Sequence, residues 1–472
     1  MLIKVEQNRH LILVTLFLGL LLCSFYLFYT PSSSQVIPFK KKLIRQPTVC
    51  DKVDAAWLAS DRIYWDGWMD KAMFIKTDGT FTKGHVYIEQ GQHVCIVVLL
   101  GPTPAKASIK DEQHDHIGPS DSITMFAEGE HSKRTIQLEQ HPEQTNVYMA
   151  AVQFNQPDTY TLDTTTEYRH FFWESPIHHA YHPFQYASQN KLVVSPVNMT
   201  EILPLCKHHT LTGTWVDLDI YAASDAQALY TMYENTENEH SVYNKVFIPD
   251  QCRFEYKSSG HAARCLGKQT VHVWGDNNLR RNLKALDSQW CGSDTQDRCV
   301  CDDDHEPPTP WMMGKPLLIQ NSWDIDSKIY YYPVHGPLTY QHETLLDRMA
   351  QYKDSVADIV ILGFGNDDIE ALQVTPKQFA TTLTTFLDRV RRIYPHQRIV
   401  LRTPQYFIGS QGTWNTGRSY AFTLAVRHAV IGHDILLWDT HHLGTDETLC
   451  PSIYSKRHVV NIENQMLWHL LC

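Results

Sequence analysis

The sequence is poor in positive charge. Its 41 lysine and arginine residues are outnumbered by 52 aspartate and glutamate residues, which gives a formal net charge of -11 at pH 7. A surface of this sign repels phosphate backbones, so the charge balance argues against a nucleic-acid partner. Internal repeats and long low-complexity segments are also lacking, which excludes repeat arrays. Hydrophobic residues make up 43% of the 472 positions, as is ordinary for a globular protein of two or three domains.

A long apolar run lies near the N-terminus, at residues 11–29. At about 1.5 Å per residue it nearly spans a hydrocarbon core of about 30 Å. Its end, Tyr26 to Tyr29, is a poor cleavage site for a signal peptide. We therefore expect a transmembrane signal anchor at 11–29 with a cytoplasmic tail at 1–10. The basic cluster at 40–45 outnumbers the basic residues before the run and leaves the orientation open on charge alone.

Cysteine usage indicates an oxidising compartment. All of the 11 cysteines except Cys23 lie outside the apolar run and are spread along the rest of the chain. An even set distributed in this way is typical of disulfides in the secretory lumen. Asn198 stands in an Asn-Met-Thr sequon for N-glycosylation, which fits the same compartment. The expected protein is a single-pass membrane protein with a lumenal body, in the Golgi or at the cell surface.

Composition and pattern divide the lumenal part into three segments. Residues 30–49 are rich in proline, serine and lysine without sustained periodicity, which indicates a stalk. Short strand-like runs separated by turns fill residues 50–200 and predict a β-sandwich module. From residue 203 to residue 472, strands alternate with helices. Such alternation predicts a mostly parallel sheet covered by helices on both faces, a three-layer α/β/α domain.

The elements of that second domain can be placed along the chain. Strands are expected at 271–275, 358–363, 398–403 and 434–438, and helices at 376–394, 417–431 and 459–471. The first strand ends abruptly at Gly275 and Asp276, and an arginine-rich helical segment follows. A residue at such a turn projects from the carboxyl edge of the sheet, where open α/β folds keep their sites.

Several motifs of residues 203–472 resemble the PC-esterase domain of the neurexophilin and PC-esterase family, relatives of the SGNH hydrolases. They are the Gly-x-Trp of Gly213 to Trp215, the cysteine-bearing lead of Cys252 and Cys265, Gly-Asp-x-x-Leu-Arg from Gly275 to Arg280, and the closing Glu463-Asn464-Gln465. The strand pair joined by residues 156–158 resembles the filamin- or neurexophilin-type domains that precede PC-esterase domains. The resemblance implies an SGNH-like fold that removes or transfers acyl groups, typically acetyl, on glycans of the secretory pathway, with no cofactor.

The resemblance also reveals a substitution at the nucleophile. Family members commonly carry serine after Gly-Asp, and here that position is Asn277, whose amide cannot be deprotonated into an attacking oxygen. The first hypothesis is therefore an impaired esterase that binds a glycan or glycoprotein. The alternative is an active O-acyl esterase or transferase with a non-standard site, in which Asn277 donates to an oxyanion and His442 activates a water or an acceptor hydroxyl.

The remaining site positions follow from the same resemblance, and each has a plain structural alternative. Gly336 would supply a backbone oxyanion donor or a simple turn, and Asn366 a side-chain donor or a Gly-Asn-Asp turn. Asp439 and His442 have the Asp-x-x-His spacing of an orienting acid and a base.

Two residues flank the nucleophile position. Asp276 would be a site carboxylate or a carboxylate that caps the turn, and Arg280 a ligand-binding cation or a cation on the helix surface. Cys450 and His458 are the other candidates for the position of the catalytic histidine. The cysteine- and aspartate-rich segment 299–305 is interpreted as disulfides with an acidic loop, so no metal is expected.

Overall fold

The structure is a computed structural model. It describes residues 47–54, 69–101, 116–174, 176, 182–197, 203–206, 211–217, 219–220, 231–233, 245–257, 264–286, 317–319, 328–352, 357–407, 412–444, 448–449, 454–455 and 457–472. The expected signal anchor at 11–29, Asn198, Cys450 and the segment 299–305 lie outside these ranges, as does the side chain of His458. Within the described residues, no helix combines the length and the apolar character that crossing a membrane requires. Thr48 to Cys472 form one compact unit.

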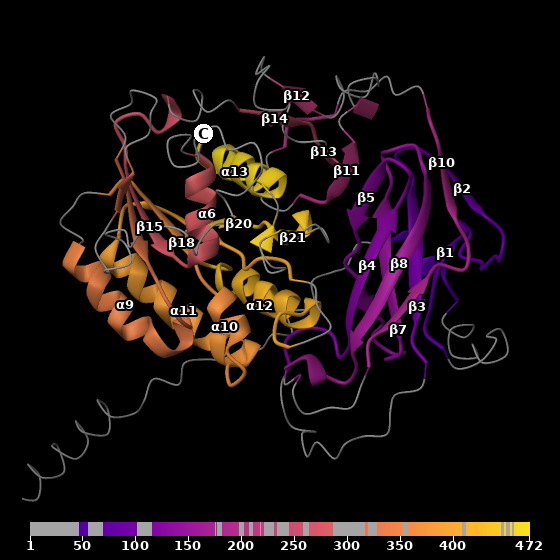
Figure 1. Ribbon diagram of the computed structural model, residues 1–472, viewed down its shortest axis with the longest axis horizontal. Helices are drawn as coiled ribbons and strands as arrows, with labels where there is room; N and C mark the ends of the chain where they lie inside the picture. The colour runs from indigo at the N-terminus through magenta and orange to yellow at the C-terminus, as the bar shows by residue number, and fades with distance from the viewer. Residues whose placement is uncertain are drawn as a thin grey trace, which may run out of the picture. The chain divides into compact units, whose positions relative to one another are not determined.

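The first part of this unit is a β-sandwich, drawn in indigo and magenta in Figure 1. One sheet has the order β1-β3-β7-β6, and the other has the order β13-β11-β5-β4-β8-β10-β2, with β9 also paired to β8. The strands are β1 (Lys71–Ile75), β2 (Val86–Glu89), β3 (His93–Leu99), β4 (Ser122–Glu128), β5 (Ser132–Thr135), β6 (Glu139–Gln140), β7 (Val147–Gln153), β8 (Thr159–Tyr168), β9 (Phe184–Ala187), β10 (Leu192–Ser195), β11 (Gly213–Asp217) and β13 (Lys245–Pro249).

Alternation along the strands produces the core of the sandwich. In β8, Tyr160, Leu162 and Thr164 are buried, whereas the residues between them are partly exposed. Successive side chains of a strand point to opposite faces, so one face of β8 packs inward. The same core contains apolar residues of both sheets, among them Ile96 of β3 and Met125 of β4. The sandwich therefore closes around side chains from its two inner faces.

The second sandwich sheet includes strands from both sides of residue 203. Trp215 and Val216 of β11 pair with Lys133 and Ser132 of β5, and β13 pairs in turn with β11. The indole Nε1 of Trp215 donates to the carbonyl of Leu443, beyond the last strand of the second domain. The sandwich thus includes strands from beyond residue 203, and it has a buried hydrogen bond to the α/β part.

The second part contains a six-stranded sheet of order β16-β17-β15-β18-β19-β20. All neighbours in it are parallel except β16, which is antiparallel to β17. The strands are β15 (Thr270–Gly275), β16 (Leu317–Ile319), β17 (Lys328–Pro333), β18 (Ile359–Gly363), β19 (Arg398–Arg402) and β20 (Leu436–Trp438). The expected mixed α/β architecture is confirmed.

Helices cover both faces of this sheet (Figure 1). Val271 and Val273 of β15 pack with α6 (Asn277–Leu286) and α13 (Arg457–Leu471). Trp274, which points the other way, packs in the cluster that contains α9 (Leu338–Tyr352), α11 (Pro376–Ile393) and α12 (Thr416–Ala429). The result is three layers, with the carboxyl ends of five parallel strands along one edge.

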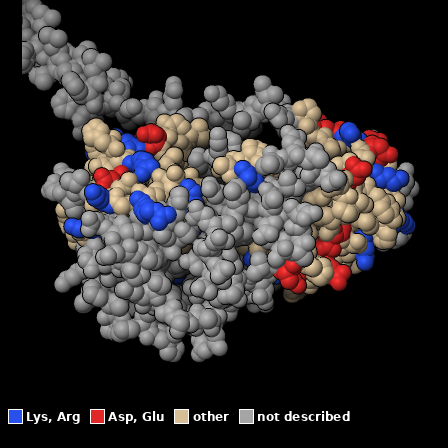
Figure 2. Space-filling model, turned by 90° about the horizontal axis from the view of Figure 1, so that it is seen from above, with Lys and Arg blue, Asp and Glu red and all other residues tan. Residues whose placement is uncertain are grey.

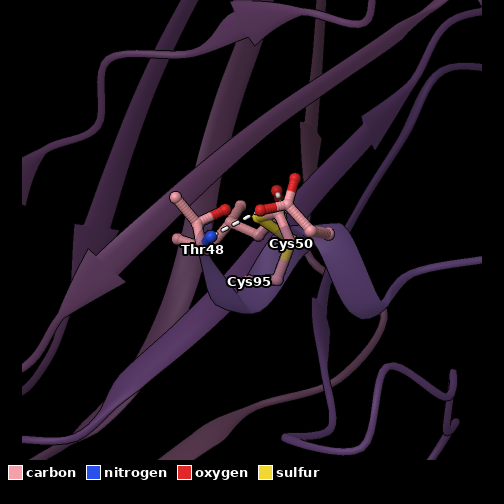
Figure 3. The surroundings of a disulfide bond; sticks show 5 residues. Thr48, Cys50 and Cys95 are labelled. Atoms are coloured by element: carbon pink, nitrogen blue, oxygen red, sulfur yellow. Dashed lines mark hydrogen bonds between the residues drawn. A yellow bond between two sulfur atoms is a disulfide. The ribbon is translucent and has the colours of Figure 1, made fainter. Parts of the chain in front are cut away.

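Shorter elements and disulfides complete the unit. The short elements are η1 (Val49–Lys52), η3 (Phe172–Glu174), β12 (Thr231–Tyr233), β14 (Phe254–Tyr256), α10 (Asn366–Glu370), η6 (His441–Leu443), β21 (Thr448–Leu449) and β22 (Tyr454–Ser455). Disulfides join Cys50 to Cys95, Cys206 to Cys252 and Cys265 to Cys472. Figure 3 shows the first of them, which ties η1 to strand β3.

Gly275, at the end of β15, allows a close approach between the sheet and α6. A Cβ atom there would lie 2.5 Å from Cδ2 of Leu279 and 2.7 Å from the carbonyl oxygen of Gly363. We predict that Gly275→Ala lowers the free energy of unfolding by about 1–3 kcal/mol, the usual cost of overpacking. Urea denaturation measures it. Gly84→Ala is the control, since the nearest atom to its Cβ is Oγ1 of Thr82 at 3.5 Å. Equal effects of the two substitutions would contradict this account.

Candidate functional site

The strand order locates the site on the sheet. In chain order the parallel strands are β15, β17, β18, β19 and β20, and in space they run β17-β15-β18-β19-β20. This is the doubly wound order 2-1-3-4-5, in which ligands bind at the carboxyl ends of the first and third strands, where the winding reverses. The switch point here lies between β15 and β18. The loops that begin at Asp276 and Phe364 therefore form the candidate site.

Asp276 and Asn366 meet at the switch point. One carboxyl oxygen of Asp276, Oδ1, accepts from the backbone amides of Asn278 and Leu279 at 3.0 and 3.2 Å and so caps α6. The other, Oδ2, accepts from Nδ2 of Asn366 at 2.8 Å. Oδ1 of Asn366 in turn accepts from the amide of Gln405 at 2.9 Å. Both side chains are buried. Asp276 is thus a helix cap and also a partner of the predicted oxyanion donor.

Asn277 is the first residue of α6 and is partly exposed, in contrast to Asp276 before it and Asn278 after it. The structure therefore places Asn277, partly exposed, directly after the carboxyl end of the first strand. Its amide can both donate and accept hydrogen bonds, but it has no ionisable proton with which to start acyl transfer.

Asp367, which the sequence analysis did not single out, lies beside this pair. Its Oδ2 accepts from the backbone amide of Gly336 at 2.7 Å, so the predicted oxyanion donor of that loop is bonded to a carboxyl group. Burial, followed by the negative charge of Asp276, raises the pKa of Asp367 to about 7. Burial also raises the pKa of Asp276, against the positive charge of Arg402. Two neighbouring carboxyl groups thus compete for ionisation.

Asp368 has a different role from its neighbour. Its carboxyl oxygens accept from the backbone amides of Leu338 and Thr339 at 2.8 and 3.0 Å, and from Oγ1 of Thr339 at 2.6 Å. Because these bonds satisfy the start of α9, Asp368 holds that helix to the loop after β18. Of the adjacent pair Asp367 and Asp368, only Asp367 is partly exposed.

At the end of β20, Arg427 lies between the predicted acid, Asp439, and the predicted base, His442. Oδ2 of Asp439 accepts from Nε of Arg427 at 2.7 Å, and Nη2 of Arg427 lies 2.7 Å from Nε2 of His442. Since arginine only donates, Nε2 of His442 accepts, and a neutral ring carries its proton on Nδ1. Desolvation lowers the pKa of His442 to about 4, despite the negative charge of Asp439. Arg427 therefore bridges the two groups.

Adjacent to it, His441 is buried between aromatic rings. Its ring lies 5.2 Å from that of Tyr406 and 5.7 Å from that of Tyr420, and its Nδ1 is 3.1 Å from Oγ1 of Thr423. Burial lowers the pKa of His441 well below its usual range. Spacing alone could not decide which of two consecutive histidines faces the core, and the structure assigns that place to His441.

Arg280 is not on the helix surface, since only 2% of it is exposed. Desolvation and the charges of Arg280 and Arg348 lower the pKa of His335. A second buried cation, Arg402, donates to Oε1 of Glu463 at 2.9 Å, and Oε2 of Glu463 accepts from Asn282 at 2.8 Å. Asn282 of α6 and Glu463 of α13 thus join the two helices through a buried hydrogen bond. No group of three or more metal-ligand residues occurs in the described ranges.

Comparisons with known proteins complete the description. No family model matches the chain, and no curated protein matches it. Solved structures similar to part of it include a carbohydrate esterase family 3 from Talaromyces cellulolyticus, at 12% identity and a TM-score of 0.30, covering 42% of this chain and 94% of that one. Another is Axe2, an acetylxylan esterase from Geobacillus stearothermophilus, at 12% identity and a TM-score of 0.29, covering 43% and 94%. At these scores the likeness says nothing about chemistry, which rests on the residues above.

The raised pKa of Asp367 makes a prediction about stability. The folded carboxyl keeps its proton up to about pH 7, whereas the unfolded one loses it near about pH 4. The folded state binds more protons in this window, so the stability contributed by Asp367 falls as pH rises through it. Asp367→Asn should therefore gain stability relative to the natural chain between about pH 4 and pH 7, as chemical denaturation at several pH values would measure. Asp347→Asn, exposed on α9, should show no such trend.

The bridging arginine makes another prediction. Removing its charge and its bond to Nε2 leaves His442 facing Asp439, so Arg427→Gln should raise the pKa of His442 from about 4. Titration of the imidazole C–H resonances by NMR measures the midpoint. Arg392→Gln, an exposed position of α11, is the control. An unchanged midpoint in Arg427→Gln would show that Arg427 does not govern this histidine.

Proposed function

We propose that this chain is a membrane-anchored, lumenal binding protein for a hydroxyl-rich, glycan-type ligand, built on an SGNH-like, PC-esterase-type α/β domain that has lost esterase turnover. The observation that carries the proposal is the position of Arg427 between Asp439 and His442. A base whose acceptor nitrogen is occupied by a guanidinium cannot take a proton from a nucleophile. Asn277, at the position where the family has serine, offers no such proton either.

The switch point suits a ligand with hydroxyl groups. The amide of Asn277 donates and accepts, and the Asp367 carboxyl, with a pKa of about 7, is present in both protonation states near neutral pH. Groups that can either donate or accept a hydrogen bond suit a ligand with hydroxyl groups, because a hydroxyl group also does both. Three disulfides support an oxidising compartment, and the apolar run at 11–29 supports anchoring in its membrane.

A second candidate function is an active O-acyl esterase or transferase that uses a non-standard site. The observation in its favour is again Asp367, because a carboxyl group with a pKa near the working pH is suited to general acid–base catalysis. In that reaction Asn277 would hold the oxyanion, and its removal would cost about 10²–10³ in rate.

One experiment separates the two functions. Hydrolysis of 4-nitrophenyl acetate and of an O-acetylated oligosaccharide is measured for the natural chain, Asn277→Ala, Asn277→Ser, and Asn277→Ser combined with Arg427→Gln. We expect turnover by the combined variant alone. It has a serine nucleophile and a histidine released from the guanidinium, whereas Asn277→Ser by itself leaves Nε2 of His442 bonded to Arg427. Turnover by the natural chain that falls at least about a hundredfold in Asn277→Ala would establish the second function instead.

A further inference from the structure

The N-terminus of α12 is completed by the β-sandwich. Glu167 of β8, which is 2% exposed, accepts through Oε2 from the backbone amide of Thr416 at 3.0 Å and through Oε1 from its hydroxyl at 3.2 Å. The same carboxyl group accepts from Ser122 at 2.6 Å and from Thr124 at 2.7 Å. Helix N-termini have unsatisfied amides and favour negative charge, so a sandwich carboxyl serves here as a cap for a helix of the α/β part.

Further contacts reinforce this joint. The amide of Gly417 donates to Oγ of Ser122 at 2.7 Å, and a Cβ atom at Gly417 would lie 2.7 Å from Cγ of Trp173. The amide of Arg418 donates to the side chain of Asn415 at 2.9 Å, and Asn415 also donates to the carbonyl of Trp173. The first amides of the helix are therefore bonded on one side to the sandwich and on the other to their own loop.

Arg418 fastens the same end of the helix. It is fully buried, and its guanidinium donates to backbone carbonyls of Glu174 at 2.7 Å, Ile369 at 3.0 Å and Val374 at 3.0 Å, among others. Burial lowers its pKa to about 10, so it remains charged at neutral pH. A buried cation that depends on carbonyls from both parts tolerates little relative displacement, because each lost bond leaves a buried donor unpaired.

A continuous series of hydrogen bonds leads from this joint to the switch point. Ser419, one turn into α12, donates to the carbonyl of Gln405 at 2.8 Å and accepts from the amide of Phe407 at 3.1 Å. The amide of Gln405 donates to Asn366 at 2.9 Å, and Asn366 donates to Asp276 at 2.8 Å. The loop after β19 is therefore held between α12 on one side and the bonded pair of Asn366 and Asp276 on the other.

The other end of α12 reaches the loop after β20. Arg427, in its last turn, bonds Asp439 and His442, and Thr423 bonds His441. A shift of α12 along or about its axis would move both loops that border the switch point on the β19 and β20 side. The helix is thus placed to transmit the position of the sandwich to the carboxyl edge of the sheet.

We infer that Glu167 is a positioning residue for the carboxyl-edge site, and that the β-sandwich sets the geometry of the site through α12. The inference rests on the proposed function only for the location of the site. The sandwich is accordingly part of the binding unit, and its role is more than to carry the α/β domain away from the membrane. The titration of a side chain at the switch point requires no ligand. It can therefore test the inference even if the proposed function is wrong.

The test compares the titration of Asp367 in the full chain and in Glu167→Gln. The glutamine keeps the shape but replaces one acceptor oxygen with an amide group that faces donors, so Thr416 must move. The carboxyl resonance of Asp367, in protein labelled with 13C-aspartate and assigned with Asp367→Asn, gives its midpoint. We expect the midpoint to shift by about half a pH unit or more, the size of a modest coupling between distant sites.

The matched control is Ile96→Val in the sandwich core. Ile96 is fully buried in the sandwich cluster, so the substitution costs about 0.5–1.5 kcal/mol of stability and leaves the joint intact. Its Asp367 midpoint should equal that of the natural chain. Ser122→Ala, which removes the bonds of its Oγ to Gly417 and to Glu167 but keeps the Glu167 carboxyl group, is the milder second variant should Glu167→Gln not fold. A folded Glu167 or Ser122 variant with an unchanged midpoint would overturn the inference, as would an equal shift in Ile96→Val.

Discussion

The carboxyl group of Asp276 is the point on which the site depends. It caps α6 with one oxygen and holds Asn366 with the other, and it stands at the end of the first parallel strand, where the winding of the sheet reverses. A buried carboxyl that is satisfied on both oxygens fixes the entry of the helix and the loop after β18 together. Burial, together with the negative charge of Asp276, raises the pKa of the neighbouring Asp367 to about 7, so that Asp367 is partly protonated near neutral pH.

In the function proposed above, charge pairing is the reason for binding without acyl transfer at this edge. At the β20 end, Arg427 pairs with Asp439 and occupies the acceptor nitrogen of His442, and in the proposed function this prevents His442 from taking a proton from a nucleophile. At the β15 end, the groups that remain accessible, Asn277 and Asp367, form hydrogen bonds in either sense. In the proposed function, such a surface would distinguish ligands by the arrangement of their hydroxyl groups.

The sequence was informative where periodicity and turn chemistry are local. The helix expected at 376–394 is found at Pro376–Ile393, because Thr375 and Pro376 mark its start and a helical apolar spacing follows. The strand expected at 398–403 is found at Arg398–Arg402. The contribution of β11 and β13 to the sandwich sheet is a pairing between distant segments, for which the sequence has no local signal. Asp367, Arg427 and Glu167 were missed for the same reason, since their roles depend on partners from other elements.

Strands from both sides of residue 203 pair in one sandwich sheet, and this has a consequence for biosynthesis. Strand β5 can pair with β11 only after residue 217 has left the ribosome, and β11 can pair with β13 only after residue 249 has left it. The disulfide of Cys265 needs Cys472, 207 residues further along the chain. Until then the nascent sandwich presents an open edge with unpaired backbone groups, the kind of edge that recruits other strands. Chaperone engagement during translation is therefore expected to last well past the emergence of the sandwich strands, and to end as α12 closes against Glu167.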